Sequence, residues 1–141
     1  MVVSPAKINL HLSVGPVRPD GYHELVTVFQ ALDLQDEMFV QRADDLSLET
    51  DARYIPTGPE NLALRAAALL QERFDVRWGA QISLSKNIPV AGGMAGGSTD
   101  AAAALLACNS IWGSPASHGE LLELAAELGS DVPFCLQGGT A

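Results

Sequence analysis

Hydrophobic and polar residues alternate strictly near the start of the chain, from Lys7 to Val14. Because successive side chains of a strand point to opposite faces, this pattern predicts a half-buried strand. Its buried face would carry Ile8, Leu10, Leu12 and Val14. The next segment, residues 15–22, contains several Gly and Pro turn signals and predicts a surface loop or hairpin connection.

Three short β-compatible runs follow, at residues 25–32, 37–41 and 46–50, and acidic or polar turns separate them. Short runs joined in this way favour an antiparallel sheet over a βαβ repeat. Another alternating run, at residues 80–85, predicts one more strand.

Helical patterns occupy much of the remaining chain. One helix is expected from Thr57 to about Phe74, and an alanine-rich helix over residues 101–107. A third begins at a capping box formed by Ser117 and Glu120 and stops near Gly129. The order of strands, helix, strand and further helices predicts an α+β fold with an antiparallel-rich sheet packed against helices.

Composition fits one globular domain spanning residues 1–141, with 48% hydrophobic residues. The formal net charge of −9 opposes binding to nucleic acid or to an anionic membrane surface. Cys108 and Cys135 belong to no metal-binding pattern and predict buried thiols in a reducing compartment. With no leader-like start and no long apolar run, a cytoplasmic location is expected.

The richest segment for chemistry is residues 88–100, where a strand end is followed by four glycines, two hydroxyls and a helix. Glycines let the backbone approach an anion, and a helix N-terminus attracts it. Ser98 and Thr99 add hydroxyls that can reach phosphate or magnesium. The spacing matches neither a Walker A loop nor GxGxxG. A purely structural reading, tight strand-to-helix packing, stays open at this point.

Residues 89–102 resemble the ATP-phosphate motif of the GHMP kinases, the superfamily of galactokinase, homoserine kinase and mevalonate kinase. Three further segments narrow the resemblance to the kinases of 4-diphosphocytidyl-2-C-methyl-D-erythritol. They are Pro5-Ala-Lys-Ile-Asn-Leu, Pro19-Asp-Gly-Tyr-His-Glu-Leu and Gly129-Ser-Asp-Val-Pro-Phe-Cys-Leu. Together the matches span nearly the whole chain in the family's order.

The resemblance implies the GHMP N-terminal α+β domain, similar to the second domain of ribosomal protein S5. The family's C-terminal domain would be absent from this chain, which would then be a fragment or a truncated product. The implied reaction transfers the γ-phosphoryl group of ATP, with Mg²⁺, to a tertiary alcohol of this small-molecule substrate. Its setting would be the non-mevalonate route to isoprenoid precursors.

The same resemblance implies roles for individual residues. Asp131 would orient and deprotonate the substrate hydroxyl, and Lys7 would neutralise developing charge. Without the resemblance, Asp131 fits a helix N-cap and Lys7 a solvated lysine. Substrate binding is implied for Asn9, Tyr22 and His23. ATP binding is implied for Pro89, Ala91, Gly92, Gly93, Met94, Ala95, Gly96, Gly97, Ser98 and Thr99.

Two details of the motif depart from the usual pattern or stay open. Ala91 and Ala95 stand where many relatives have glycine. We expect the loop to keep its function, because alanine is tolerated wherever φ is negative. Lys86, just before the loop, either approaches the nucleotide or is a solvated lysine at a strand end.

Other functions are compatible with parts of the sequence. Another GHMP kinase would share the phosphate motif but lack the Asp-Gly-Tyr-His turn at residues 20–23. An RNA-binding module of S5-like fold would need a basic face, which the net charge of −9 opposes. An inactive fragment that only binds nucleotide is the third alternative.

Overall fold

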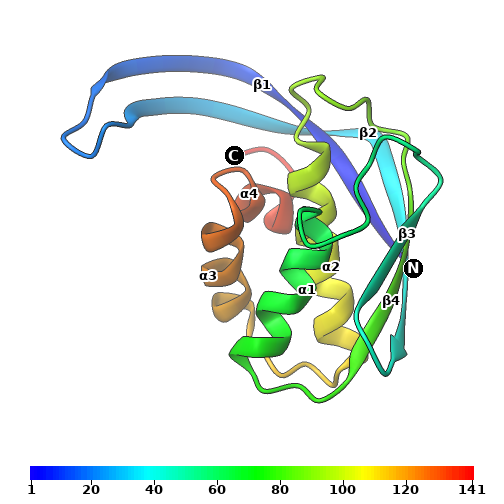
Figure 1. The fold of residues 1–141 in the computed structure, drawn as a ribbon. Helices are drawn as coiled ribbons and strands as arrows, with labels where there is room; N and C mark the ends of the chain where they lie inside the picture. Colours follow the sequence, from blue (N-terminus) through cyan, green and yellow to red (C-terminus); the bar gives the residue numbers. More distant parts are fainter.

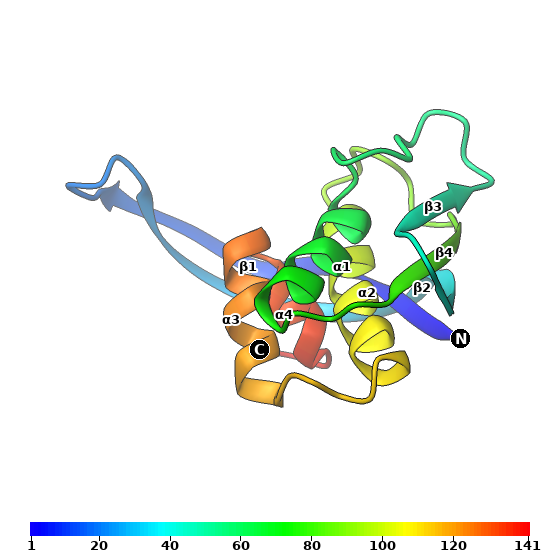
Figure 2. The ribbon, with the colours of Figure 1, turned by 60° about the horizontal axis from the view of Figure 1, so that its bottom comes forward.

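The computed structural model describes all residues of the chain, Met1–Ala141. It contains a four-stranded sheet and four helices that lie together on one side of it (Figures 1 and 2). The elements are β1 (Val2–Val17), β2 (His23–Ala43), β3 (Ser47–Thr50), α1 (Leu62–Arg73), β4 (Gly79–Ser85), α2 (Gly96–Ile111), α3 (His118–Leu128) and α4 (Val132–Gln137). The predicted α+β class is confirmed.

The sheet has the strand order β1-β2-β4-β3. The β1–β2 and β2–β4 pairs are antiparallel as predicted, whereas β3 runs parallel to β4. The prediction of separate strands at 25–32 and 37–41 is wrong, because both runs belong to β2. Asp36, which we expected in a polar turn between them, is fully buried and bonded on both carboxylate oxygens, so the chain continues through it as strand.

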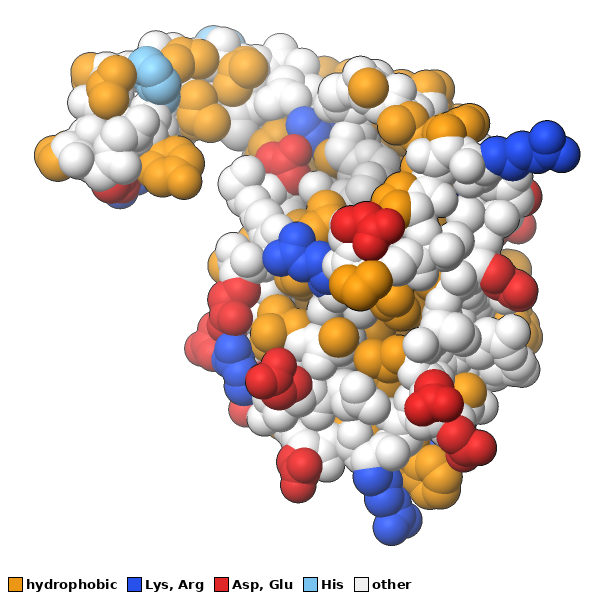
Figure 3. Space-filling model, viewed as in Figure 1, with side chains coloured by type: hydrophobic (Ala, Val, Ile, Leu, Met, Phe, Trp, Pro, Cys, Tyr) orange, Lys and Arg blue, Asp and Glu red, His pale blue; other side chains and the backbone are white.

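The outer part of the β1–β2 hairpin projects from the body of the molecule (Figure 1). This part, residues 10–28, is called the arm below. The strand prediction for Lys7–Val14 is confirmed, but its predicted burial is wrong. Leu10, Leu12 and Val14 are 59%, 54% and 59% exposed, and apolar side chains cover much of the arm in Figure 3. Lys7, from the expected polar face, is buried instead.

The core lies between the sheet and the helices. Its largest fully buried side chains include Met38, Leu70, Ile82, Leu105 and Leu124, and burying a side chain of this size contributes about 1.5–3 kcal/mol. Small alanines on the buried side of α2 bring the helix close to the sheet; these are Ala101, Ala102, Ala103, Ala104 and Ala107.

Helix ends agree with the sequence signals in part. The predicted capping box of α3 is present, with Ser117 and Glu120 bonded reciprocally. The predicted start of α1 at Thr57 is wrong. The helix begins at Leu62 because Asn61 caps it, its side chain accepting the N–H of Ala63 at 2.9 Å. None of the helices is long and apolar enough to cross a membrane.

Candidate active site

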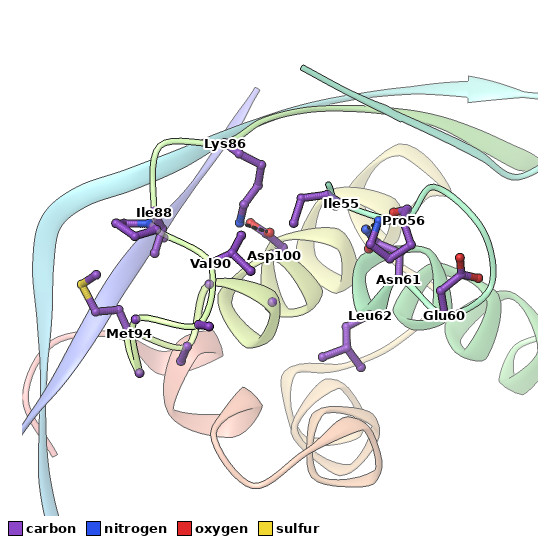
Figure 4. A pocket seen from close by; sticks show the side chains of 17 residues that line it. Ile55, Pro56, Glu60, Asn61, Leu62, Lys86, Ile88, Val90, Met94 and Asp100 are labelled. Carbon is purple, nitrogen blue, oxygen red and sulfur yellow. Dashed lines mark hydrogen bonds and ion pairs between the residues drawn. The ribbon is translucent and has the colours of Figure 1, made fainter. Parts of the chain in front are cut away.

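Residues 89–95, called the glycine loop below, connect β4 to α2 and border a cavity of about 370 Å³ (Figure 4). The cavity is also lined by Lys86, Asp100, the first residues of α2 and the Ile55–Leu62 region. Ala95, at the N-cap of α2, makes no side-chain capping bond. The first N–H groups of a helix have no intrahelical acceptor, and Gly96 and Gly97 at the start of α2 line the cavity, so the geometry suits an anion.

The backbone of the glycine loop overturns one expectation. Ala91 and Ala95 have φ values of 61° and 58°, so both alanines occupy the left-handed region that we expected them to avoid. This conformation costs a residue with a Cβ roughly 1–2 kcal/mol. At these two positions the loop therefore keeps the left-handed backbone conformation that glycine adopts most easily, although alanine is strained in it.

Two hydrogen bonds attach strand β1 to this loop and to the first turn of α2. The backbone N–H of Lys7 donates to the carbonyl of Met94 at 3.1 Å, and the hydroxyl of Thr99 donates to the carbonyl of Pro5 at 2.8 Å. Thr99 is consequently buried, and neither Thr99 nor Ser98 is among the residues that line the cavity. The hydrogen bonds place the base of the Lys7 side chain directly beside the loop.

The side chains of Lys7 and Asp131 form an ion pair, with Nζ 3.3 Å from Oδ2. Lys7 is 7% exposed and Asp131 is 32% exposed, so the pair is open to solvent on the carboxylate side. The ammonium also donates to Oδ1 of Asn9 at 3.0 Å and lies 4.8 Å from the ring centre of Phe29. Lys7 is therefore not a solvated lysine.

Asp131 does occupy the N-cap position of α4, yet its side chain makes no capping hydrogen bond. The capping interpretation thus holds for the position of the residue but not for its carboxylate. That carboxylate is directed to Lys7 instead, at the exposed end of the pair.

A second lysine–aspartate cluster joins β2, the residue that follows β4, and α2. Lys86 donates to both Asp36 and Asp100, the latter at 2.7 Å, and the three side chains are 3%, 0% and 5% exposed. Asp36 also accepts the backbone N–H groups of Asn87 and Ile88. The solvated interpretation of Lys86 is wrong, although Lys86 does line the cavity as the nucleotide-facing alternative requires.

Burial governs the charges of this cluster. It raises the pKa of Asp100 to about 7, against the opposing effect of the Lys86 ammonium and with a further upward contribution from Asp36. Burial alone would lower the pKa of Lys86, but its bonds to the two carboxylates outweigh that effect and the pKa is raised. Sequence reasoning missed Asp36 and Asp100. Asp100 adjoins the glycine motif, whereas Asp36 lies in a polar stretch that gives no sign of burial.

Tyr22 and His23 lie where β1 turns into β2, at the tip of the arm. This tip is well away from the segment between β4 and α2 in Figure 1. Tyr22 is 75% exposed. The Nδ1 atom of His23 lies 2.9 Å from the carbonyl oxygen of Gly15; since a carbonyl only accepts, Nδ1 carries the proton. In this tautomer the Nε2 atom is an acceptor. The structure thus brings Asn9 and Asp131 to Lys7, which is bonded to the loop, but does not bring these two residues there.

This fold and glycine loop define the class of protein. The family model for the GHMP kinases N terminal domain matches residues 61–139, and the chain belongs to this family. It is 57% identical over 143 residues to the 4-diphosphocytidyl-2-C-methyl-D-erythritol kinase of Saccharopolyspora erythraea, covering 97% of this chain and 45% of that protein. The enzyme of the same name from Rhodococcus jostii is 53% identical, covering 100% and 46%.

Solved structures give the same result. The crystal structure of a 4-(cytidine 5'-diphospho)-2C-methyl-D-erythritol kinase has a TM-score of 0.83 and 43% identity, covering 99% of this chain and 50% of that one. The mevalonate kinase of Methanococcus jannaschii, at a TM-score of 0.75 and 15% identity, shares the fold. The chain spans about half the length of the relatives that it matches.

Proposed function

We propose that this protein transfers the γ-phosphoryl group of ATP to the tertiary alcohol of 4-diphosphocytidyl-2-C-methyl-D-erythritol, giving the 2-phosphate and ADP in non-mevalonate isoprenoid precursor synthesis. The observation that carries the proposal is the double attachment of Lys7. Its backbone N–H binds the glycine loop at 3.1 Å, while its ammonium lies 3.3 Å from Asp131. One residue thus connects the anion site with a partly exposed carboxylate.

The ATP phosphates would lie against the first turn of α2, where free N–H groups and the helix dipole stabilise negative charge. Pro89, Ala91–Ala95 and the Gly96–Gly97 pair contribute the lining. Thr99 would act indirectly, because its hydroxyl holds α2 to β1 through Pro5. The base would occupy the apolar end of the cavity near Ile55, Pro56 and Leu62.

Magnesium fits this arrangement, because Mg²⁺ takes only one or two protein oxygens beside those of phosphate and water. Phosphate and water oxygens would hold most of its coordination sphere, because Ser98, in the first turn of α2, is not among the residues that line the cavity. When bound, the ion supplies neutralisation of charge on the β- and γ-phosphates.

Asp131 would accept the proton of the attacking hydroxyl, because its carboxylate is the exposed member of the pair. The Lys7 ammonium would stabilise negative charge on the transferred group. Phosphoryl transfer depends largely on such positioning and electrostatic stabilisation. Asn9 holds the Lys7 ammonium in place by accepting a hydrogen bond from it at 3.0 Å.

The cytidine end of the substrate would extend along the arm. Tyr22 offers an exposed ring for stacking. The Nε2 acceptor of His23 would select a base with an amino donor, such as cytosine, over one with a carbonyl at that position. The free thiols of Cys108 and Cys135 support a cytoplasmic setting for the reaction.

An ADP-release assay tests the proposal, with purified protein, Mg-ATP and 4-diphosphocytidyl-2-C-methyl-D-erythritol. Homoserine and mevalonate serve as competing acceptors, and Asp131→Asn serves as the inactive control. We expect turnover with the cytidine substrate alone and its loss in the control. Turnover with homoserine or mevalonate instead would contradict the proposed substrate.

A further inference from the structure

Lys7 ends a chain of hydrogen bonds that begins in the arm. Its ammonium donates to Oδ1 of Asn9 at 3.0 Å. The Asn9 amide donates from Nδ2 to the hydroxyl of Thr27 at 2.7 Å. That hydroxyl in turn donates to the carbonyl of His11 at 2.8 Å. The chain links a backbone group of the hairpin to the ion pair with Asp131.

Donor and acceptor chemistry permits one orientation of this chain. A carbonyl only accepts, so the proton of the Thr27 hydroxyl points to His11. The hydroxyl oxygen is then left to accept, which directs the Nδ2 side of the Asn9 amide toward it. The opposite side of the amide, Oδ1, therefore faces Lys7, and an ammonium can only donate. Every donor in the chain of hydrogen bonds thus faces an acceptor.

A β-bulge makes this geometry possible. Asn9 pairs with Phe29 and His11 pairs with Val28, so Leu10 is an extra residue in β1. A bulge of this kind bends its strand and re-aims neighbouring side chains. Here the Thr27 side chain reaches both the Asn9 amide and the His11 carbonyl, two residues apart on the facing strand.

The Lys7 side chain needs such support, because a lysine side chain is long and loses up to about 2 kcal/mol of rotamer entropy when it is fixed. Asp131, its ionic partner, is itself 32% exposed and stands at the N-cap of the short helix α4. The Asn9–Thr27 chain and the Phe29 ring are thus its connections to the sheet.

We propose that Thr27 is a positioning residue that sets the place of the Lys7 ammonium through the side-chain amide of Asn9. Its consequence for catalysis rests on the proposed function, whereas the positioning itself does not. No feature of the sequence indicates this role, since Thr27 is one of several β-branched residues in its strand.

The test compares Thr27→Val, which keeps the shape of the side chain and removes the hydroxyl, with Thr27→Ser, which keeps the hydroxyl. Ser13→Ala is the matched control, because it removes a neighbouring hydroxyl of the arm outside the chain. The NMR signals of the Asn9 side-chain amide and of Lys7 Cε report the positioning without any substrate. We expect Thr27→Val to move both signals, and Thr27→Ser and Ser13→Ala to leave them near their wild-type positions.

Kinetics supply the second arm. We expect kcat of Thr27→Val to fall about tenfold, the effect of losing a hydrogen bond of about 1.4 kcal/mol, with KM for ATP unchanged and with rescue by Thr27→Ser. If Lys7→Met keeps full turnover, the proposed catalytic role of Lys7 fails while the NMR result still decides the positioning. Thr27→Val signals that coincide with those of the wild type would overturn the proposal.

Discussion

Two lysine–aspartate clusters lie near the glycine loop, and they differ in burial. Lys7 and Asp131 are 7% and 32% exposed, whereas none of the side chains of Lys86, Asp36 and Asp100 exceeds 5%. The same residue types thus occur in two environments. A carboxylate open to solvent can receive a substrate proton, whereas Asp36 and Asp100 are bound to Lys86 away from solvent.

The buried cluster connects three parts of the fold. Asp36 belongs to β2, Lys86 follows β4 and Asp100 lies in the first turns of α2. Figure 4 shows Lys86 beside Asp100. A Cβ on Gly96 would meet Lys86 Nζ at 3.3 Å, so glycine permits the close approach of lysine and helix. This cluster holds the loop, and the exposed cluster is the one that we assign to chemistry.

The largest effect is expected in the buried cluster. Lys86→Met leaves two carboxylates buried without a counter-charge and should lower the free energy of unfolding by about 3–5 kcal/mol. Urea denaturation measures it. Adding Asp36→Asn and Asp100→Asn to Lys86→Met should restore part of the loss. An unchanged urea midpoint in Lys86→Met would show that this cluster does not stabilise the fold.

The pair of Lys7 and Asp131 should show the opposite pattern, with a large loss of turnover and a smaller loss of stability. We expect Asp131→Asn to lower turnover by about 10²–10³-fold, as for loss of a general base. Its free energy of unfolding should fall by less than that of Lys86→Met, because the Lys7 ammonium keeps its contacts with Asn9 and the Phe29 ring. Asp20→Asn, at another exposed pair, controls for a simple change of charge. Equal losses of stability in Asp131→Asn and Lys86→Met would erase the distinction between the clusters.

A smaller effect is expected at the tip of the arm, because we assign the tip to binding the cytidine end of the substrate and not to the phosphoryl transfer. Loss of a stacked base costs about 1–3 kcal/mol, so Tyr22→Ala should raise KM for the cytidine substrate by roughly tenfold. KM for ATP should not change. Tyr54→Ala is the matched control, because Tyr54 is similarly exposed at 71%. An unchanged KM in Tyr22→Ala would separate the arm tip from substrate binding.

The smallest effect concerns the loop between the clusters. Ala95 has a φ of 58°, so Ala95→Gly relieves strain and should stabilise the protein by up to about 1 kcal/mol. Ala102→Gly, within α2, should destabilise it by about 1 kcal/mol. Thermal unfolding of the two variants compares them. Stability changes of the same sign in both variants would mean that the left-handed conformation of Ala95 stores no strain.

Local signals in the sequence predicted the elements whose causes are local. The capping box at Ser117, the alternation in β4 and the glycine segment each depend on neighbouring residues, and each was found where expected. The α+β class followed from their order.

Features set by distant contacts were not predictable in this way. The alternation from Lys7 to Val14 indicates a strand but not whether helices cover it, and the arm extends past them. Asp36 is buried because Lys86, fifty positions away, neutralises it. The positive φ of Ala91 and Ala95 reflects the loop's attachment to β1, which no local preference of alanine would indicate.

The most direct test of the central claim is a crystal structure of this protein with Mg²⁺, a non-hydrolysable ATP analogue and 4-diphosphocytidyl-2-C-methyl-D-erythritol. We predict the β- and γ-phosphates on the N–H groups at the start of α2, the γ-phosphate beside Lys7, and the tertiary hydroxyl of the substrate within hydrogen-bond distance of Asp131. Phosphates bound away from the glycine loop, or a hydroxyl remote from Asp131, would contradict it.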